Sequence, residues 1–192
     1  AVAALLYQYE IDREFPDAVM LEAKATPQSV EESAVAGRLD LRDKVMITID
    51  GASSKDLDDA VSLERDGLGR WVLGVHIADV SHYVRPGSAL DLEAWERGTS
   101  VYFADQVVPM LPRELSNGIC SLNPRVDRLA LSCVMTLTPE GEVVDHTIAK
   151  SVIRTTERMT YEDCNRLLAG EDPDLEARYA HILPMLRDMA VL

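Results

Sequence analysis

The stretch ITIDGASSKDLDDAV, residues 47–61, places four aspartates within ten positions, namely Asp50, Asp56, Asp58 and Asp59. Aspartate is a poor former of strands and helix interiors, and carboxylates this close to one another repel. The stretch nevertheless lies between two apolar segments, KVMITID before the cluster and AVSLER after it. These segments predict two strands, with one aspartate at the end of the first and the others just before the second.

A turn that faces solvent and a site for a cation both fit this aspartate cluster. Carboxylates that converge on one point are stable only if cations neutralise them or if some of them carry protons. The small residues 51–54 form a loop that would let both strand ends direct carboxylates toward a shared point. Hard oxygen ligands favour Mg²⁺, Mn²⁺ or Ca²⁺ over zinc, and phosphoryl transfer is the commonest chemistry at such a site. An EF-hand loop is excluded, because its ligand spacing and closing glutamate are missing.

The segment DLDDA, residues 56–60, also partly resembles the D-x-D-x-[TV] loop of haloacid-dehalogenase-type phosphatases. In those enzymes the nucleophilic aspartate directly follows an apolar strand. Here the aspartate in that place is Asp50, and Ala60 stands where threonine or valine belongs. These departures argue against a phosphatase.

The composition is typical of a soluble globular protein with one substantial core. The chain has 192 residues, of which 47% are hydrophobic and 27% charged. Its net charge of -14 means that its surface as a whole does not attract a polyanion. A nucleic-acid partner would therefore need bound cations, a local basic track or segments outside this chain.

Cysteine usage and hydropathy indicate a cytoplasmic protein with no membrane partner. The three cysteines, Cys120, Cys133 and Cys164, show no CxxC spacing, so we expect neither structural zinc nor a disulfide framework. No apolar run approaches the length of a transmembrane helix. The first residues are apolar but lack the basic region of a signal peptide.

Residue patterns predict an α+β fold with mainly antiparallel strands and helices packed outside. The sequence SALDLEAWERG has a serine cap and a C-terminal glycine, and TYEDCNRLLAG has the same arrangement with threonine. Residues 129–154 read as two strands joined by a turn at Pro139, Glu140 and Gly141. The other predicted elements are strands near 44–50, 60–65 and up to 78, helices over 1–14 and 17–25, and a helix from 174 that Pro184 bends.

With its flanks, the aspartate stretch resembles the catalytic RNB domain of the ribonuclease II/ribonuclease R family, most closely the ribonuclease R type. Three blocks occur in the family's order: RLDLRDKVMITIDGASSKDLDDAVSLE, WVLGVHIADVSHYVRPGSALDLEAWERGTSVYF and VVPMLPRELSNGICSLNPRVDRLALSCVMTL. Family members carry aspartate at one of the positions of Ser53 and Ser54. The resemblance divides the chain into lead-in helices and a linker, residues 1–37, and the N-terminal part of an RNB domain, residues 38–192. The family's domain continues past Leu192, so we expect it to be incomplete at the C-terminus.

The resemblance implies a processive 3′-to-5′ exoribonuclease that hydrolyses single-stranded RNA to nucleoside 5′-monophosphates. The family's catalytic aspartates fall on Asp50, Asp56, Asp58 and Asp59, which would hold Mg²⁺, or Mn²⁺ as a substitute, in a two-metal arrangement. Asp50 and Asp59 are the implied direct ligands, and Asp58 is the residue implied to matter most for the chemistry. The family also implies flanking RNA-binding barrel domains, which would explain the acidic balance of this chain, and we expect a monomer.

Two tyrosines match RNA-contacting positions of the family. Tyr102, in GTSVYF, matches the tyrosine that stacks near the 3′ end and sets the length of the final product, a contact that tolerates any base. Tyr161, in MTYEDC, aligns with a tyrosine near the terminal sugar, whose 2′-OH distinguishes RNA from DNA. Asn117 and Ser121 are candidates for contacts near the RNA channel.

Two further interpretations concern histidines and loss of activity. His76 and Asp79, in HIADVSH, suggest zinc or a catalytic triad, but residues three apart on a strand point to opposite faces, so we expect structural roles. A catalytically inactive RNB-like module that only binds RNA is the alternative to the enzyme. The intact aspartates argue against it.

Overall fold

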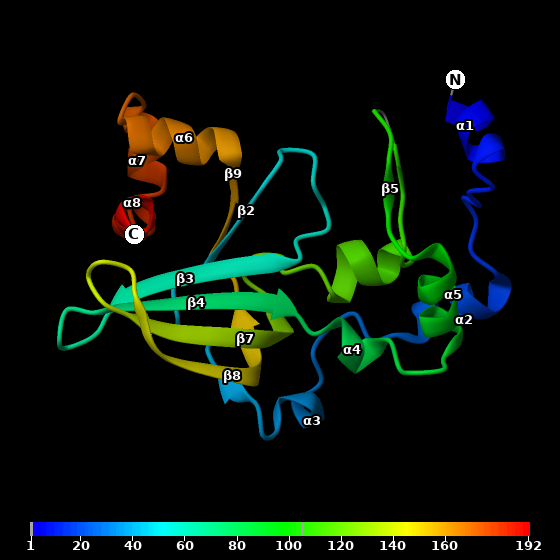
Figure 1. Cartoon of the computed structure of the whole chain (residues 1–192), viewed down its shortest axis with the longest axis horizontal. Helices are drawn as coiled ribbons and strands as arrows, with labels where there is room; N and C mark the ends of the chain where they lie inside the picture. The colour runs from blue at the N-terminus through cyan, green and yellow to red at the C-terminus, as the bar shows by residue number, and fades with distance from the viewer. Residues whose placement is uncertain (1, 105) are drawn as a thin grey trace.

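A seven-stranded sheet with the order β1-β8-β7-β4-β3-β2-β9 forms the centre of the molecule (Figure 1). The computed structural model describes residues 2–104 and 106–192. Four neighbouring pairs are antiparallel, whereas the outer pairs β1/β8 and β2/β9 are parallel. The expected α+β fold with mainly antiparallel strands is therefore confirmed. The strands are β1 (Leu39–Asp40), β2 (Ile47–Asp50), β3 (Asp59–Arg65), β4 (Trp71–Ala78), β7 (Asp127–Leu137), β8 (Val143–Arg154) and β9 (Glu157–Thr160).

The helices lie outside this sheet, and a separate two-stranded hairpin, β5 (Val101–Tyr102) with β6 (Val107–Val108), stands apart from it (Figure 1). Within the described residues no helix is both long and apolar enough to span a bilayer. The helices are α1 (Val2–Gln8), α2 (Asp17–Ala25), α3 (Glu32–Val35), α4 (Val80–Tyr83), α5 (Ala89–Arg97), the wide π-type turn η1 (Glu114–Ile119), α6 (Tyr161–Ala169), α7 (Pro173–Arg178) and α8 (Leu183–Val191).

Most predicted elements are present, but two predicted helices are shorter than expected. The first ends at Gln8 instead of residue 14, and Glu10 beyond it adopts a left-handed φ of 53°; residue 1 lies outside the described residues. The helix predicted from residue 174 is two helices, α7 and α8. Pro184 lies in the first turn of α8, where its missing N–H costs no hydrogen bond, rather than bending a continuous helix.

The sheet buries apolar side chains on both faces. Neighbours on β3 point to opposite faces, so Val61 packs against one cluster and Ala60 belongs to another. The first cluster joins the sheet to α6, α7 and α8, which gather at one end of the molecule in Figure 1. Its fully buried members include Ile47, Met159, Leu167 and Ile182, the second cluster includes Met46, Leu57, Leu122 and Ile153, and a third joins α2, α5 and η1 through Val19, Leu90 and Leu115.

His76 has the structural role that the sequence predicts. Its Nδ1 lies 2.7 Å from Ser132 Oγ and its Nε2 lies 3.1 Å from Ser62 Oγ, and the side chain is 1% exposed. Ser132 Oγ in turn lies 2.6 Å from Ser151 Oγ, so the network crosses four strands. Gly74 leaves room for the ring, because a Cβ there would lie 2.6 Å from His76 Nε2.

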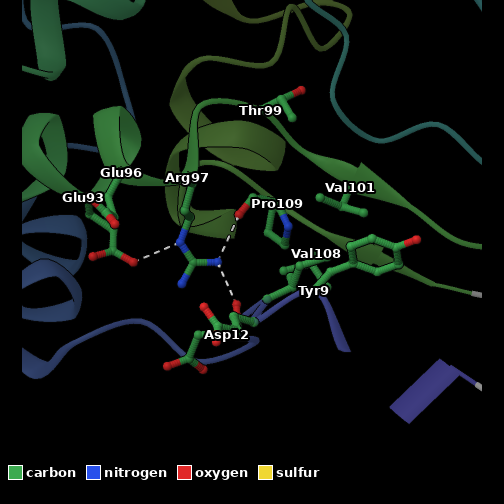
Figure 2. Close-up of a pocket in the computed structure, with 11 residues that line it drawn as sticks. Tyr9, Asp12, Glu93, Glu96, Arg97, Thr99, Val101, Val108 and Pro109 are labelled. Carbon is green, nitrogen blue, oxygen red and sulfur yellow. Dashed lines mark hydrogen bonds and ion pairs between the residues drawn. The ribbon is translucent and has the colours of Figure 1, made fainter. Parts of the chain in front are cut away.

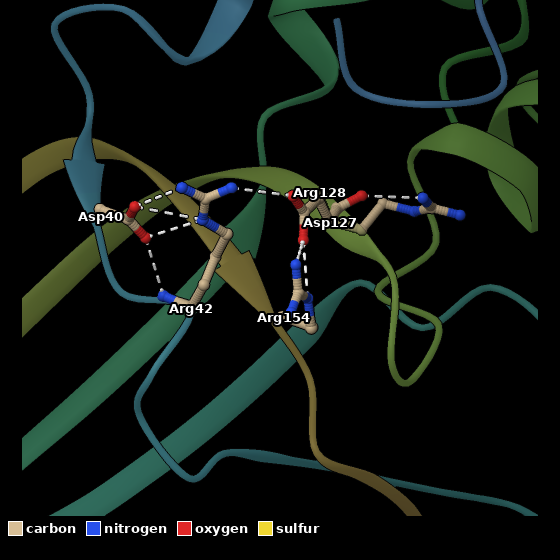
Figure 3. A network of polar contacts seen from close by, with 5 residues as sticks. All are labelled: Asp40, Arg42, Asp127, Arg128 and Arg154. Atoms are coloured by element: carbon tan, nitrogen blue, oxygen red, sulfur yellow. Dashed lines mark hydrogen bonds and ion pairs between the residues drawn. The ribbon is translucent and has the colours of Figure 1, made fainter. Parts of the chain in front are cut away.

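Ion pairs attach residues 38–42, just before β2, to the rest of the sheet. Asp127 accepts hydrogen bonds from Arg42 Nη1 at 3.0 Å and from Arg154 Nε at 2.8 Å (Figure 3). Hydrogen bonds from Arg42 lower the pKa of the Asp40 carboxyl to about 2. Asp79 is also structural, since Arg38 Nη2 donates to its Oδ2 at 2.7 Å and both side chains are almost fully buried.

Replacing His76 with glutamine should reduce the pH dependence of folding stability. Burial lowers the pKa of His76 from 6.5 to about 4, so the unfolded chain binds a proton more readily than the folded chain. His76 therefore contributes stability above its unfolded pKa that is lost as the pH falls toward its folded pKa. Between about pH 7.5 and about pH 5.5 this loss amounts to about 1 kcal/mol. Urea unfolding of wild type and His76→Gln at both pH values measures it.

The control for this experiment is His146→Gln, which changes an exposed histidine on β8. We expect that variant to lose as much stability on acidification as the wild type. Equal losses in the wild type and in His76→Gln would contradict the assignment.

Candidate active site

The four aspartates lie in and beside the loop that connects β2 to β3. Asp50 is the last residue of β2 and Asp59 the first of β3. Asp50 pairs with Thr160 of β9, and Asp59 pairs with Ile77 of β4. Figure 1 shows this loop (residues 51–58) extending beyond the sheet between the start of α6 and the β5–β6 hairpin. The two strand ends bring the four aspartates into one region of the fold, but within the described residues their carboxylates do not meet at the shared point that the sequence predicts.

A buried leucine and a buried serine hold the second half of the loop. Leu57 is 1% exposed, and its carbonyl accepts a hydrogen bond from Leu122 N at 2.8 Å. Ser121 Oγ donates to Lys55 O at 2.8 Å and accepts from Leu57 N at 3.1 Å. Ser121 is fully buried, so its side chain is not available for the predicted contact near an RNA channel, and it supports the loop instead.

An arginine from β9 holds the first half of the loop. Arg158 Nη2 donates to the carbonyl oxygens of Gly51, Ala52 and Ser54, at 3.3, 3.0 and 2.7 Å. Sequence reasoning missed this residue, because a single arginine in a strand gives no signal of the loop that it contacts. The parallel pairing of β2 with β9 brings them together.

The electrostatics of the cluster show negative charge that the protein does not fully compensate. Partial burial raises the pKa of Asp50, and the charges of Asp59 and Asp56 raise it further, while Arg158 lowers it. Partial burial likewise raises the pKa of Asp58, together with the charges of the other three aspartates. The four carboxylates are therefore close enough to repel one another, and a bound cation would relieve that repulsion.

The donor set fits a hard cation, although the side chains do not converge on one point. Carboxylate oxygens are the ligands that Mg²⁺ and Mn²⁺ prefer. Across residues 2–104 and 106–192, no three His, Cys, Asp or Glu side chains are arranged so that they could hold a metal ion. Asp59 is exposed, whereas the carboxyl group of Asp58 is partly buried. The residues thus suit a cation in chemistry, and holding one would require these side chains to adopt other rotamers.

The structure places both predicted RNA-binding tyrosines beside the aspartate loop. Tyr102, in β5, donates its hydroxyl to Asp56 Oδ2 at 3.2 Å, and the residue is 66% exposed. Partial burial and the charge of Asp56 raise the pKa of this hydroxyl. Tyr161 is the first residue of α6, directly after the Thr160 that pairs with Asp50, and it is 61% exposed. Tyr102 therefore contacts the cluster directly, whereas Tyr161 is its neighbour along the chain, and both residues are exposed.

A separate cavity of about 260 Å³ lies between α5 and the N-terminal segment (Figure 2). Arg97 crosses it, with Nη1 donating to Asp12 O at 3.1 Å and to Pro109 O at 3.4 Å. Its Nε donates to Glu93 at 2.8 Å. None of the four aspartates or two tyrosines lines this cavity, so its arginine joins elements of the fold rather than serving the aspartate site.

Replacing Asp58 with asparagine should stabilise the chain when no divalent cation is present. Because the pKa of Asp58 is raised, its charge opposes folding above that pKa, and the penalty is relieved as the pH falls through it. Asparagine removes the charge, so we expect the melting temperature at neutral pH to rise by roughly 2 °C. Added Mn²⁺ should stabilise the wild type more than the variant.

Asp43→Asn, in the exposed segment before β2, is the matched control for this measurement. Calorimetry with and without Mn²⁺ on all three proteins makes the comparison. A lower melting temperature for Asp58→Asn in the metal-free state would contradict the electrostatic assignment.

Comparison with curated proteins identifies close relatives. The chain is 53% identical over its full length to Ribonuclease R 1 of Lactococcus lactis. It is 54% identical over 86% of its length to Ribonuclease R of Thermotoga maritima, and 46% identical over 98% to Ribonuclease R of Escherichia coli. Each match covers 23% of the relative, so the chain spans about a quarter of the length of these proteins.

Solved structures give the same result at the level of the fold. RNase R of Mycoplasma genitalium, in complex with ribose-methylated single-stranded RNA, matches 99% of the chain with a TM-score of 0.88 and 31% identity, over 29% of that protein. The yeast pseudonuclease Ssd1 shares the fold at 22% identity, with a TM-score of 0.69. The RNB domain family model matches residues 38–191. The chain therefore belongs to the RNB domain family, and its relatives are of the ribonuclease R type.

Proposed function

We propose that this chain carries the catalytic aspartates of a ribonuclease R-type exoribonuclease. The reaction is processive hydrolysis of single-stranded RNA from its 3′ end, and the product is nucleoside 5′-monophosphates. The observation that carries the proposal is the aspartate loop together with two exposed tyrosines, Tyr102 hydrogen-bonded to Asp56 and Tyr161 directly after the residue that pairs with Asp50. RNA as the substrate is supported by the relatives from Mycoplasma genitalium, which are solved in complex with single-stranded and with double-stranded RNA.

Asp50, Asp56, Asp58 and Asp59 would hold Mg²⁺, with Mn²⁺ as a substitute. When bound, the metal supplies an activated water and neutralises the charge that develops on the leaving oxygen. Asp50 and Asp59 terminate facing strands and are the proposed direct ligands. Asp58 follows the buried Leu57, which fixes the backbone that carries this carboxylate. Arg158 and Ser121 keep the loop in one shape while the carboxylates act.

The tyrosines position the substrate. The exposed ring of Tyr102 offers a surface on which the base near the 3′ end stacks, and such stacking is independent of the base and so suits processive degradation. Its hydroxyl lies 3.2 Å from Asp56 Oδ2, so the ring lies beside the aspartates. Tyr161, next to Asp50 through β9, contacts the terminal sugar, where the 2′-OH identifies RNA.

The acidic charge of the chain requires other parts of a longer protein to attract RNA. With a net charge of -14, this chain repels a polyanion except where cations bind. In our proposal residues 1–37 are the lead-in and residues 38–192 the N-terminal part of the catalytic domain, and flanking barrel domains grip the RNA. We propose a monomer that acts in the cytoplasm.

An inactive RNA-binding module is the second candidate. Two observations favour keeping it: the fold is shared with a pseudonuclease, and the described side chains do not converge on a metal ion as they stand. All four aspartates are nevertheless present in this chain, which is what the enzyme requires. The phosphatase alternative has no support, because the chain belongs to the RNB domain family.

Asp58→Asn should abolish RNA hydrolysis while leaving RNA binding intact. The assay uses a chimera in which this chain replaces the matching segment of Ribonuclease R 1 of Lactococcus lactis. A labelled single-stranded RNA is incubated with and without Mg²⁺. We expect turnover to fall by roughly 100-fold or more, since loss of groups around a metal already costs about 10-fold to 100-fold.

The Asp43→Asn chimera controls for loss of charge, and filter binding measures RNA affinity. Unchanged turnover in Asp58→Asn would refute the catalytic role. A wild-type chimera that binds RNA but releases no mononucleotide would favour the inactive module.

Tyr102→Ala should change the length of the limit product with the hydrolytic step retained. Loss of a stacked base costs about 1–3 kcal/mol of binding, so the shortest fragments would dissociate before they are cleaved. Tyr102→Phe keeps the ring and removes only the hydrogen bond to Asp56, so we expect its limit product to match the wild type. Gel analysis of the final fragments distinguishes these outcomes. An unaltered limit product in Tyr102→Ala would contradict the stacking role.

A further inference from the structure

The first half of the aspartate loop depends on a single side chain outside it. Residues 51–54 are Gly, Ala, Ser and Ser, which are too small to bury apolar surface. Besides the turn bond from Ser54 N to Gly51 O at 3.0 Å, their carbonyl groups are held by Arg158. Residues 51–54 therefore make few contacts among themselves that would keep this half of the loop in one conformation.

The contacts of Arg158 are unusual for an arginine beside four carboxylates. Its Nη2 donates to three backbone carbonyls, while its Nε is buried without a hydrogen-bond partner among the described residues. The same guanidinium is close enough to Asp50 for its charge to oppose the effect of burial on that carboxyl. The positive charge of Arg158 therefore binds the backbone carbonyls of the loop and also lowers the pKa of Asp50.

The position of Arg158 in β9 connects three parts of the site. Arg158 lies opposite Thr48 in the parallel β2–β9 pair, and two residues later Thr160 lies opposite Asp50. Thr160 Oγ1 accepts a hydrogen bond from Asp163 N at 3.0 Å and so caps the helix that Tyr161 begins. One short strand therefore carries the loop's anchor, the partner of Asp50 and the start of α6.

We propose that Arg158 is a positioning residue of the cation site, which clamps residues 51–54 so that Asp50 and Asp56 keep a fixed separation. The inference rests on the proposed function, because it assumes that the aspartates bind a divalent cation. Arg158 itself touches neither the cation nor the RNA. Three converging carbonyls without the guanidinium would repel one another and the neighbouring carboxylates, and the loop would then open.

The second half of the loop, which Ser121 holds, differs from the half that Arg158 holds. Ser121 anchors Lys55 and Leu57 through neutral hydrogen bonds in the core, and Leu57 adds buried apolar surface. That half of the loop keeps its shape without any charge. The half that Arg158 holds has no such support, so removal of Arg158 acts on residues 51–54 and on Asp50, shifts them relative to Asp56, and leaves the core intact.

The test compares Arg158→Met, Arg158→Lys and a control, Arg187→Met, which breaks an exposed ion pair with Glu176 on another part of the surface. Five quantities are measured. On the chain these are Mn²⁺ affinity by electron paramagnetic resonance and amide exchange of residues 51–57 by mass spectrometry. In the chimera they are kcat, KM for RNA and the Mg²⁺ concentration for half-maximal activity. Circular dichroism verifies that each variant is folded.

We expect Arg158→Met to weaken Mn²⁺ binding and to raise the half-maximal Mg²⁺ concentration by about 10-fold to 100-fold. KM for RNA should stay within about twofold of the control, because Arg158 does not contact the substrate in this proposal. Amide exchange should accelerate in the loop alone. Arg158→Lys should recover part of the affinity, since an ammonium keeps the charge and can donate to the same carbonyls. Added guanidinium should partly restore activity to Arg158→Met.

Two results would overturn the inference. Mn²⁺ affinity and half-maximal Mg²⁺ of Arg158→Met equal to those of Arg187→Met would remove the positioning role, as would an unchanged exchange rate in the loop. If Arg158→Met does not fold, Arg158→Lys decides by the same two measurements. A wild-type chain that binds no Mn²⁺, together with an inactive wild-type chimera, would instead refute the proposed function. Loop exchange then reports on the clamp alone.

Discussion

Repulsion among four carboxylates is the constraint on which the rest of the site depends. The loop between β2 and β3 places Asp50, Asp56, Asp58 and Asp59 close enough to raise the pKa of two of them on top of the effect of burial. Such a loop would open unless the fold held it. The protein holds it with buried Leu57 and two buried or half-buried side chains from distant segments. The sheet order, which places β9 beside β2, is what makes the second of these contacts possible.

The location of the site at a sheet end, rather than in a deep cavity, fits a polymer substrate. The aspartates and both tyrosines are at least partly exposed, and the cavity of Figure 2 lies elsewhere. A chain with a net charge of -14 offers little general attraction for RNA. The curated relatives are about four times longer than this chain. In our proposal this segment carries out the hydrolysis, and the other segments of the longer protein bind the RNA.

Local signals predicted local structure well. Helix α2 has the predicted bounds, Ser88 and Thr160 cap their helices as expected, and the β7–β8 hairpin turns at Gly141, whose φ of 90° favours glycine. Errors arose where distant contacts decide. Helical periodicity in the sequence continues through residues 179–182, yet the helix is interrupted there. Ser121 has the sequence context of a polar loop residue, although the core surrounds it. The short strands β5, β6 and β9 have too few residues to show a period.

The sequence by itself determined the two strands around the aspartates, the α+β class and, through resemblance, the family, because these follow from residue order and local preference. Only the tertiary structure decided which side chains hold the aspartate loop. Arg158 is about a hundred residues from the carbonyls that it contacts, and Ser121 is more than sixty from Lys55. Tyr102 contacts Asp56 from a hairpin that the residue pattern of the sequence does not predict. The contact of Arg158 depends on the parallel β2–β9 pairing, and pairing between distant strands is a property of the folded chain.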